Sequence, residues 1–297
     1  MSKPADRRTG GPADRTAASL PSSSRAAEPR NRRAGGWPSS LWGMILRDLT
    51  VLRRNLAPFI TRTVMNPLLF VFIFTYVLPR IGQQVETGIA GVSYATILVP
   101  GLVAVGMVFQ GISAVALPLS MELGATREIE DRVLAPIPVE LVAIEKLIFG
   151  AAQGVLAGAV VFPLVYLIPA TSVSVHVANW PLLIVVVLLA SLTSGALGLA
   201  LGTIVRPAQI GLMFALVVVP ITFLGCVYYP WAMLHPVRWL QVLVMINPLV
   251  YMSEGLRAAL TPDLPHMPVW GFLGALTAAT LLLGSVGVRA FVRRTIA

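Results

Sequence analysis

Residues 182–204 read LLIVVVLLASLTSGALGLALGTI and contain no charged side chain. A helix needs roughly 20 apolar residues to cross the hydrocarbon core of a bilayer. The whole chain has the same character, because 56% of its 297 residues are hydrophobic and only 12% are charged. Ordinary soluble domains carry about 25% charged residues. The sequence therefore excludes a soluble globule and predicts an all-α integral membrane protein.

Six stretches are long and apolar enough to span a membrane, and none of them contains Asp, Glu or Lys between its ends. They lie at about 62–79, 94–119, 147–168, 182–204, 208–229 and 269–289. A shorter apolar segment, Trp239 to Met252, is interrupted by Asn247-Pro248. We expect this segment to form a re-entrant or interfacial pair of short helices within an outer segment, 230–268.

The N-terminal part differs in composition from the rest. Residues 1–38 are rich in Arg, Ser, Pro, Ala and Gly, which predicts a disordered tail that remains in the cytoplasm. Residues 39–58 place Leu and Ile at helical spacing with Arg on other faces. This pattern predicts an amphipathic helix in the inner membrane interface, although a helix packed on a partner protein would show the same pattern.

The basic residues indicate the orientation, because short cytoplasmic loops collect Lys and Arg. With six spans, 19 of the 22 basic residues lie on the inner side and only Arg80, Arg238 and Arg257 lie outside. Seven spans would place the basic C-terminus outside. The sequence therefore predicts that both termini are cytoplasmic.

Motifs for catalysis are absent from the sequence. No phosphate-binding loop is present, because the only lysines are Lys3 and Lys146 and neither follows a glycine. Hydrolase and zinc-protease motifs are also missing, and one Cys and three scattered His residues give no metal-ligand spacing. We expect no catalytic, cofactor-binding or metal-binding residue. The uncharged spans also argue against a gradient-driven carrier, although a Na⁺ site made of carbonyls and hydroxyls stays possible.

Two charged segments interrupt the apolar pattern. The inner loop 121–146 crowds five charges together before two prolines, which predicts a short charged helix or a solvated loop. Near the outer end, Glu254 and Arg257 are three residues apart and can pair on one helical face beside Tyr251. Such a pair is either a structural ion pair or part of a site.

At these two segments the sequence resembles the membrane subunits of type-2 ABC exporters, which include daunorubicin-resistance, nodulation-factor and O-antigen or polysaccharide permeases. Residues 127–138 match the family's Glu/Arg-rich run that ends in Leu-x-x-x-Pro. Asn247 to Arg257 match its Asn-Pro-Leu/Ile-x-Tyr motif before the last span. The resemblance covers about 40–297 and departs at Ile129-Glu130, where many members have Gly-Thr.

The resemblance implies a permease subunit of an ATP-driven exporter in the bacterial inner membrane. It also implies a homodimer and a separate ABC ATPase subunit that holds ATP and Mg, with membrane lipid as surroundings and no nucleic acid. The substrate class would be amphipathic: a drug, a glycolipid or a lipid-linked polysaccharide. A membrane scaffold or sensor with a permease-like body is the alternative.

Three sets of residues are candidates for roles in such a permease. The ATPase would contact Arg127, Glu128, Glu130, Asp131, Arg132, Pro136 and Pro138. An outer gate would contain Asn247, Pro248, Tyr251, Glu254 and Arg257. Candidates for the pathway wall are Asn66, Gln110, Gln153 and Thr222, each of which could instead satisfy a neighbouring helix.

Glycines recur at every fourth residue in two of the expected spans. They are Gly150, Gly154 and Gly158 in one span and Gly198 and Gly202 in the next. Such faces let helices approach closely, either within one subunit or at a dimer seam.

Overall fold

The computed structural model describes residues 92–126, 138–167, 175–177 and 179–296, together with 43, 46, 50, 53–54, 60–61, 63, 65, 68–70 and 72–82. Every described residue belongs to one compact unit, which comprises residues 36–297. Within the described ranges the structure consists of helices, turns and loops, with no β-strand. The expected all-helical class is confirmed for this part of the chain.

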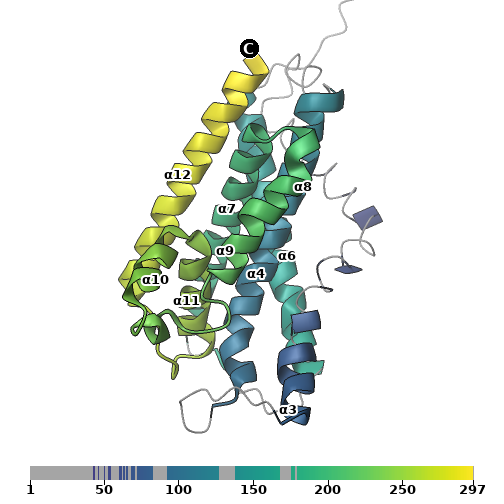
Figure 1. The fold of residues 1–297 in the computed structure, drawn as a ribbon. Helices are drawn as coiled ribbons and strands as arrows, with labels where there is room; N and C mark the ends of the chain where they lie inside the picture. The colour runs from purple at the N-terminus through teal and green to yellow at the C-terminus, as the bar shows by residue number, and fades with distance from the viewer. Residues whose placement is uncertain are drawn as a thin grey trace, which may run out of the picture. The chain divides into compact units, whose positions relative to one another are not determined.

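Four of the described helices are long and apolar enough to cross a membrane. They are α4 (Tyr94–Met121), α6 (Val139–Leu167), α7 (Trp180–Ile204) and α12 (Val269–Ile296). Each coincides with one of the expected spans to within a few residues, except that α6 begins earlier, at Val139, and α12 ends later, at Ile296. Figure 1 shows α12 running from the region of α10 and α11 to the opposite end, where the C-terminus lies.

Helix α4 is the centre of the bundle. The most apolar 18-residue window of α4 is 78% buried, whereas the corresponding window of α12 is only 17% buried. Both helices are long enough to span a membrane. Helices α6, α7 and α11 all pack against α4. The outer surfaces of the remaining helices are therefore the ones available to lipid or to other subunits.

The glycines at four-residue spacing explain how closely these helices pack. A Cβ atom on Gly198 would lie 2.9 Å from the carbonyl oxygen of Gly111 in α4, and one on Gly202 would lie 2.8 Å from Cα of Ala116. In α6, Gly154 faces the Met107 carbonyl and Gly158 faces the Met107 side chain. Packing within one subunit is confirmed, and the dimer-seam interpretation of these glycines is wrong because α4 covers them.

The expected span at 208–229 is shorter than its hydropathy suggests. It consists of η3 (Pro207–Gln209), α8 (Ile210–Met213), η4 (Phe214–Val218) and α9 (Val219–Phe223). Residues 224–230 are turns, so the prediction of a helix to 229 is wrong. Pro220 lacks an N–H for the helical ladder, which suits the π-helical turn before it, and Cys226, three residues after α9 ends, has a positive φ of 51° that does not fit a continued helix.

The first expected span is only partly described. Residues 72–82 contain η1 (Phe72–Val77) and α3 (Leu78–Arg80), and the scattered positions described between 43 and 70 are also helical. The predicted tail, 1–38, lies wholly outside the described residues. The count of six spans therefore stays a prediction.

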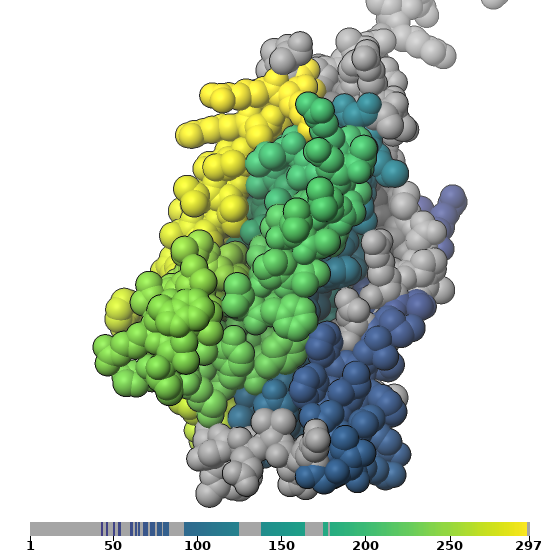
Figure 2. Space-filling model, in the orientation of Figure 1, coloured from purple at the N-terminus to yellow at the C-terminus, as the bar shows by residue number. Residues whose placement is uncertain are grey.

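Four short helices lie between the turn at 224–230 and α12. They are η5 (Trp231–Leu234), α10 (Arg238–Leu243), η6 (Val244–Ile246) and α11 (Pro248–Leu260). Figure 2 shows that this region forms a lobe on the face that also carries α8 and α9. Two short helices thus flank Asn247 as expected, and their re-entrant placement in a bilayer stays a prediction.

Candidate functional site

Helix α11 begins at Asn247 because that side chain serves as its N-cap. Its Oδ1 atom accepts a hydrogen bond from the Leu249 N–H at 3.0 Å, and Pro248 occupies the first helical position, where no N–H is needed. The Asn247 amide nitrogen donates to the carbonyl oxygen of Ile221 at 2.7 Å. The Asn247 side chain therefore caps the N-terminus of α11 and also links it to the end of α9.

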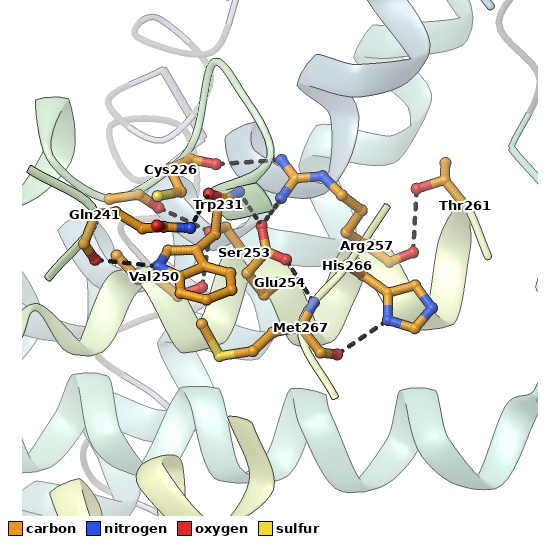
Figure 3. A network of polar contacts seen from close by, with 11 residues as sticks. Cys226, Trp231, Gln241, Val250, Ser253, Glu254, Arg257, Thr261, His266 and Met267 are labelled. Atoms are coloured by element: carbon orange, nitrogen blue, oxygen red, sulfur yellow. Dashed lines mark hydrogen bonds and ion pairs between the residues drawn. The ribbon is translucent and has the colours of Figure 1, made fainter. Parts of the chain in front are cut away.

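Glu254 is the centre of a buried polar network, drawn in Figure 3. Its Oε1 atom accepts from the backbone N–H of Trp231 at 2.9 Å, and its Oε2 atom accepts from the N–H of Met267 at 2.9 Å. The Arg257 guanidinium pairs with the same carboxylate. The network joins η5, α11 and the segment that leads into α12.

Arg257 and Glu254 are both completely buried, so the ion pair that the spacing predicts is present without contact to solvent. The Arg257 NH2 group also donates to the carbonyl oxygen of Cys226 at 3.2 Å, which holds the turn after α9. Desolvation lowers the pKa of Arg257, and the Glu254 carboxylate opposes this effect. The pair therefore links three segments: η5, the turn after α9 and the segment that leads into α12.

Two further residues complete the region expected to form the outer gate. Ser253 donates from Oγ to the Gly225 carbonyl at 2.7 Å, a contact that the sequence analysis did not identify. The Tyr251 hydroxyl donates to the Met245 carbonyl at 2.6 Å, and this ring is only partly buried. Tyr251 is thus partly exposed, as are Asn247 and Pro248, whereas the buried Glu254 and Arg257 fix the backbone around it.

The candidates for the pathway wall separate into two groups. Gln110 of α4 donates from Nε2 to Oε1 of Gln153 in α6 at 2.9 Å, and its own Oε1 accepts from Thr63 at 3.3 Å. Gln110 and Gln153 therefore satisfy neighbouring helices. Thr222 donates to the Val218 carbonyl and borders a groove, whereas Asn66 lies outside the described residues.

The groove beside Thr222 has a volume of about 480 Å³ and lies between α4 and the helical segment 210–223. Its edge includes Val219 and Phe223, which are 48% and 54% exposed, so the groove opens to the surface. None of the described residues that line it carries a charge. The groove is bordered by Phe70, Val105, Phe109, Leu117, Ile210, Gly211, Phe214, Ala215, Val218, Val219, Thr222 and Phe223.

At the other end of the bundle, the expected coupling loop is described only at its two edges. Residues 127–137 lie outside the described part, and with them Arg127, Glu128, Glu130, Asp131, Arg132 and Pro136. Pro138 is described and exposed. Beside the loop, Lys146 of α6 lies 3.2 Å from Glu122, an ion pair that the sequence analysis did not identify because its partners are 24 residues apart.

Among the described residues no group of three or more His, Cys, Asp or Glu side chains could hold a metal ion. The buried side chains of Ser253, Glu254 and Arg257 form hydrogen bonds with backbone groups of neighbouring segments. The groove offers apolar contacts to an occupant. This arrangement is suited to binding and conformational change.

Comparison with known proteins agrees with these features. A family model for ABC-2 type transporters matches residues 39–261. The chain is 29% identical over 251 residues to the inner membrane transport permease YadH of Escherichia coli strain K12, with 82% of this chain and 91% of that protein covered. The YadH proteins of E. coli O157:H7 and Shigella flexneri match with the same identity and coverage.

Proposed function

The chain belongs to the ABC-2 type transporter family, and from this premise we propose that it exports an amphipathic substrate with energy from a separate ATPase. As a transport permease it is a multi-pass inner membrane protein. In this proposal each subunit has six spans and both termini are cytoplasmic, since 19 of the 22 basic residues then lie on the inner side.

The observation that carries the substrate class is the groove of about 480 Å³ between α4 and segment 210–223, whose described lining residues are mostly apolar. Aromatic rings form much of its wall, including Phe109 and Phe214, whose centroids are 5.7 Å apart. The described wall is apolar apart from the Thr222 hydroxyl, and such a wall suits an acyl chain or a planar apolar ring system. Substrates of this kind include drugs, glycolipids and lipid-linked polysaccharides.

The energy source is inferred from the absence of a phosphate-binding loop in the sequence. An ABC ATPase partner would supply the ATP and Mg sites and would contact the loop 121–146. The Lys146–Glu122 pair supports this assignment, because it joins the two helices that flank the loop. Movement of the loop would then reach α4, which forms one wall of the groove.

The proposed assembly contains two copies of the permease. One chain has a single loop of this kind, whereas an ATPase pair offers two equivalent contacts, so a closed two-fold dimer is the simplest arrangement. The groove opens on the surface, and a second copy facing it would help to enclose a path. Tyr251, at the outer lobe, would border the exit.

The test uses proteoliposomes that contain the permease and its ATPase, with daunorubicin and an NBD-labelled glycolipid as probes. We expect ATP-dependent movement of at least one probe. Ala215→Trp, which fills the groove, should abolish this movement, whereas Ala278→Trp on the exposed face of α12 should retain it.

Two other outcomes would contradict the proposal. Movement that persists without the ATPase and stops with an uncoupler would indicate a gradient-driven carrier. A complex that binds the ATPase but moves neither probe would favour a scaffold or sensor with a permease-like body.

A further inference from the structure

The helical segment α10–η6 presents an apolar stripe that no described part of the chain covers. Trp239, Val242 and Ile246 are 70%, 67% and 82% exposed, and Leu243 is 45% exposed. Their spacing of three and four residues puts them on one helical face. In a membrane protein such a face, with a Trp at its start, suits the boundary between headgroups and acyl chains.

A pocket of about 440 Å³ lies directly beside this stripe. It is lined by Trp231, Ala232, His235, Arg238, Gln241 and Val242. Val242 belongs both to the stripe and to the pocket, so the two surfaces are continuous. A molecule with a polar head and an apolar tail could occupy both at once.

Hydrogen bonds hold the wall of this pocket in place. The indole N–H of Trp231 donates to the Gln241 carbonyl at 3.2 Å, which links η5 to α10. The backbone N–H of Trp231 donates to Glu254, the buried carboxylate of the lobe. Figure 3 shows Trp231, Gln241 and Glu254 in this arrangement. Two hydrogen bonds of Trp231 therefore hold one wall of the pocket in place.

The polar side of the pocket is positively charged. The Arg238 guanidinium lies 3.4 Å from Nε2 of His235, and both side chains are exposed. Within the part of the chain that the structure describes, no carboxylate lies within ion-pair distance of Arg238. A guanidinium with a neighbouring imidazole suits an anion with several oxygens, such as a phosphate.

We propose that this pocket binds the phosphate group of a membrane phospholipid, whose acyl chains lie along the Trp239–Ile246 stripe. Arg238 and His235 contact the phosphate oxygens, and Trp231 and Val242 contact the glycerol region. This inference rests on the proposed membrane location of the lobe. It requires neither ATP-driven transport nor a particular substrate, so the two proposals fail independently.

The test measures lipid binding to the purified full-length protein in detergent by native mass spectrometry. Four probes separate the contribution of the phosphate group from that of the acyl chains. They are phosphatidylglycerol, phosphatidylcholine, diacylglycerol and glycerol phosphate. We expect both phospholipids to bind at least about tenfold more tightly than diacylglycerol, which lacks the phosphate. Glycerol phosphate, which lacks acyl chains, should not displace them.

Two double variants and one control variant assign the binding to this pocket. The double variant Arg238→Gln/His235→Asn should weaken phospholipid binding about tenfold and leave diacylglycerol binding unchanged. Arg206→Gln, which removes another exposed cation outside the lobe, should leave the site intact. Trp239→Gln/Ile246→Gln should weaken the binding of phospholipids and diacylglycerol together.

Three results would overturn the proposal. One is equal affinity of the native chain for diacylglycerol and phosphatidylglycerol, which needs no variant to fold. Unchanged phospholipid binding in Arg238→Gln/His235→Asn is another. The third is displacement of the lipid by glycerol phosphate, which would indicate a site for soluble phosphate compounds.

Discussion

The ammonium group of Lys146, in the third turn of α6, lies 3.2 Å from a carboxylate oxygen of Glu122, the residue that follows α4. Both side chains are largely buried, with 8% and 13% of their surfaces exposed. Residues 127–137 connect these two helices. The ion pair therefore joins both ends of the proposed coupling loop, so that a force on the loop acts on α4 and α6 together.

Removal of one partner of this pair should destabilise the protein. Lys146→Met removes the ammonium group that lies 3.2 Å from the largely buried Glu122 carboxylate, and we expect a loss of up to roughly 3 kcal/mol in the free energy of unfolding. The double variant Glu122→Gln/Lys146→Met should recover most of that loss, because neither charge remains. Thermal denaturation in detergent would measure both, and equal stability of the single variant and the native chain would show that the pair contributes nothing.

Charge reversal in the loop tests its contact with the ATPase. Arg127→Glu/Arg132→Glu should leave membrane insertion intact and abolish co-purification with the ATPase, because charge-assisted bonds become repulsive. Arg206→Glu is a matched control on an exposed cation outside the loop. Normal co-purification and ATPase activity of the double variant would identify the loop as merely solvated.

The buried carboxylate of Glu254 should contribute more to the stability of the protein than the exposed carboxylate of Asp263, which lies after α11. Glu254→Ala removes the acceptors of the Trp231 and Met267 N–H groups and leaves the Arg257 guanidinium buried without its pair. We expect a loss of about 3 kcal/mol or more, and little change for Asp263→Asn. Limited proteolysis of the lobe would report the difference, and equal resistance of both variants would refute it.

Hydropathy identifies the long helices well, because crossing a membrane requires a length of apolar sequence that few other structures need. It fails at 224–230, where Gly225 and Cys226 form a turn within a sequence that is still apolar. The helix pattern of Glu254 and Arg257 predicts their pairing, since residues three apart share a face. The Lys146–Glu122 pair and the groove depend on which helices become neighbours, and local sequence does not contain that information.

The close contacts of the glycines also depend on which helices become neighbours, and one of these contacts can be tested. A Cβ on Gly195 of α7 would lie 2.3 Å from the backbone carbonyl oxygen of Leu147 in α6, so the two helices would have to separate. Gly195→Ala should cost about 1–3 kcal/mol through overpacking. Gly274→Ala in α12, where no atom lies within 4 Å of the new Cβ, should not destabilise the protein. Equal melting temperatures for the two variants would contradict the close α6–α7 contact.

Single-cysteine labelling tests the orientation, and the native chain is a suitable background because its one cysteine, Cys226, is fully buried. A membrane-impermeant maleimide added to intact cells or right-side-out vesicles should modify Pro262→Cys, in the loop between α11 and α12. It should modify Ser24→Cys and Arg294→Cys only after the membrane is permeabilised, because the excess of basic residues keeps both termini inside. Labelling of both terminal cysteines from outside would reverse the topology. It would also place the phospholipid site of the lobe in the inner leaflet, without removing the site itself.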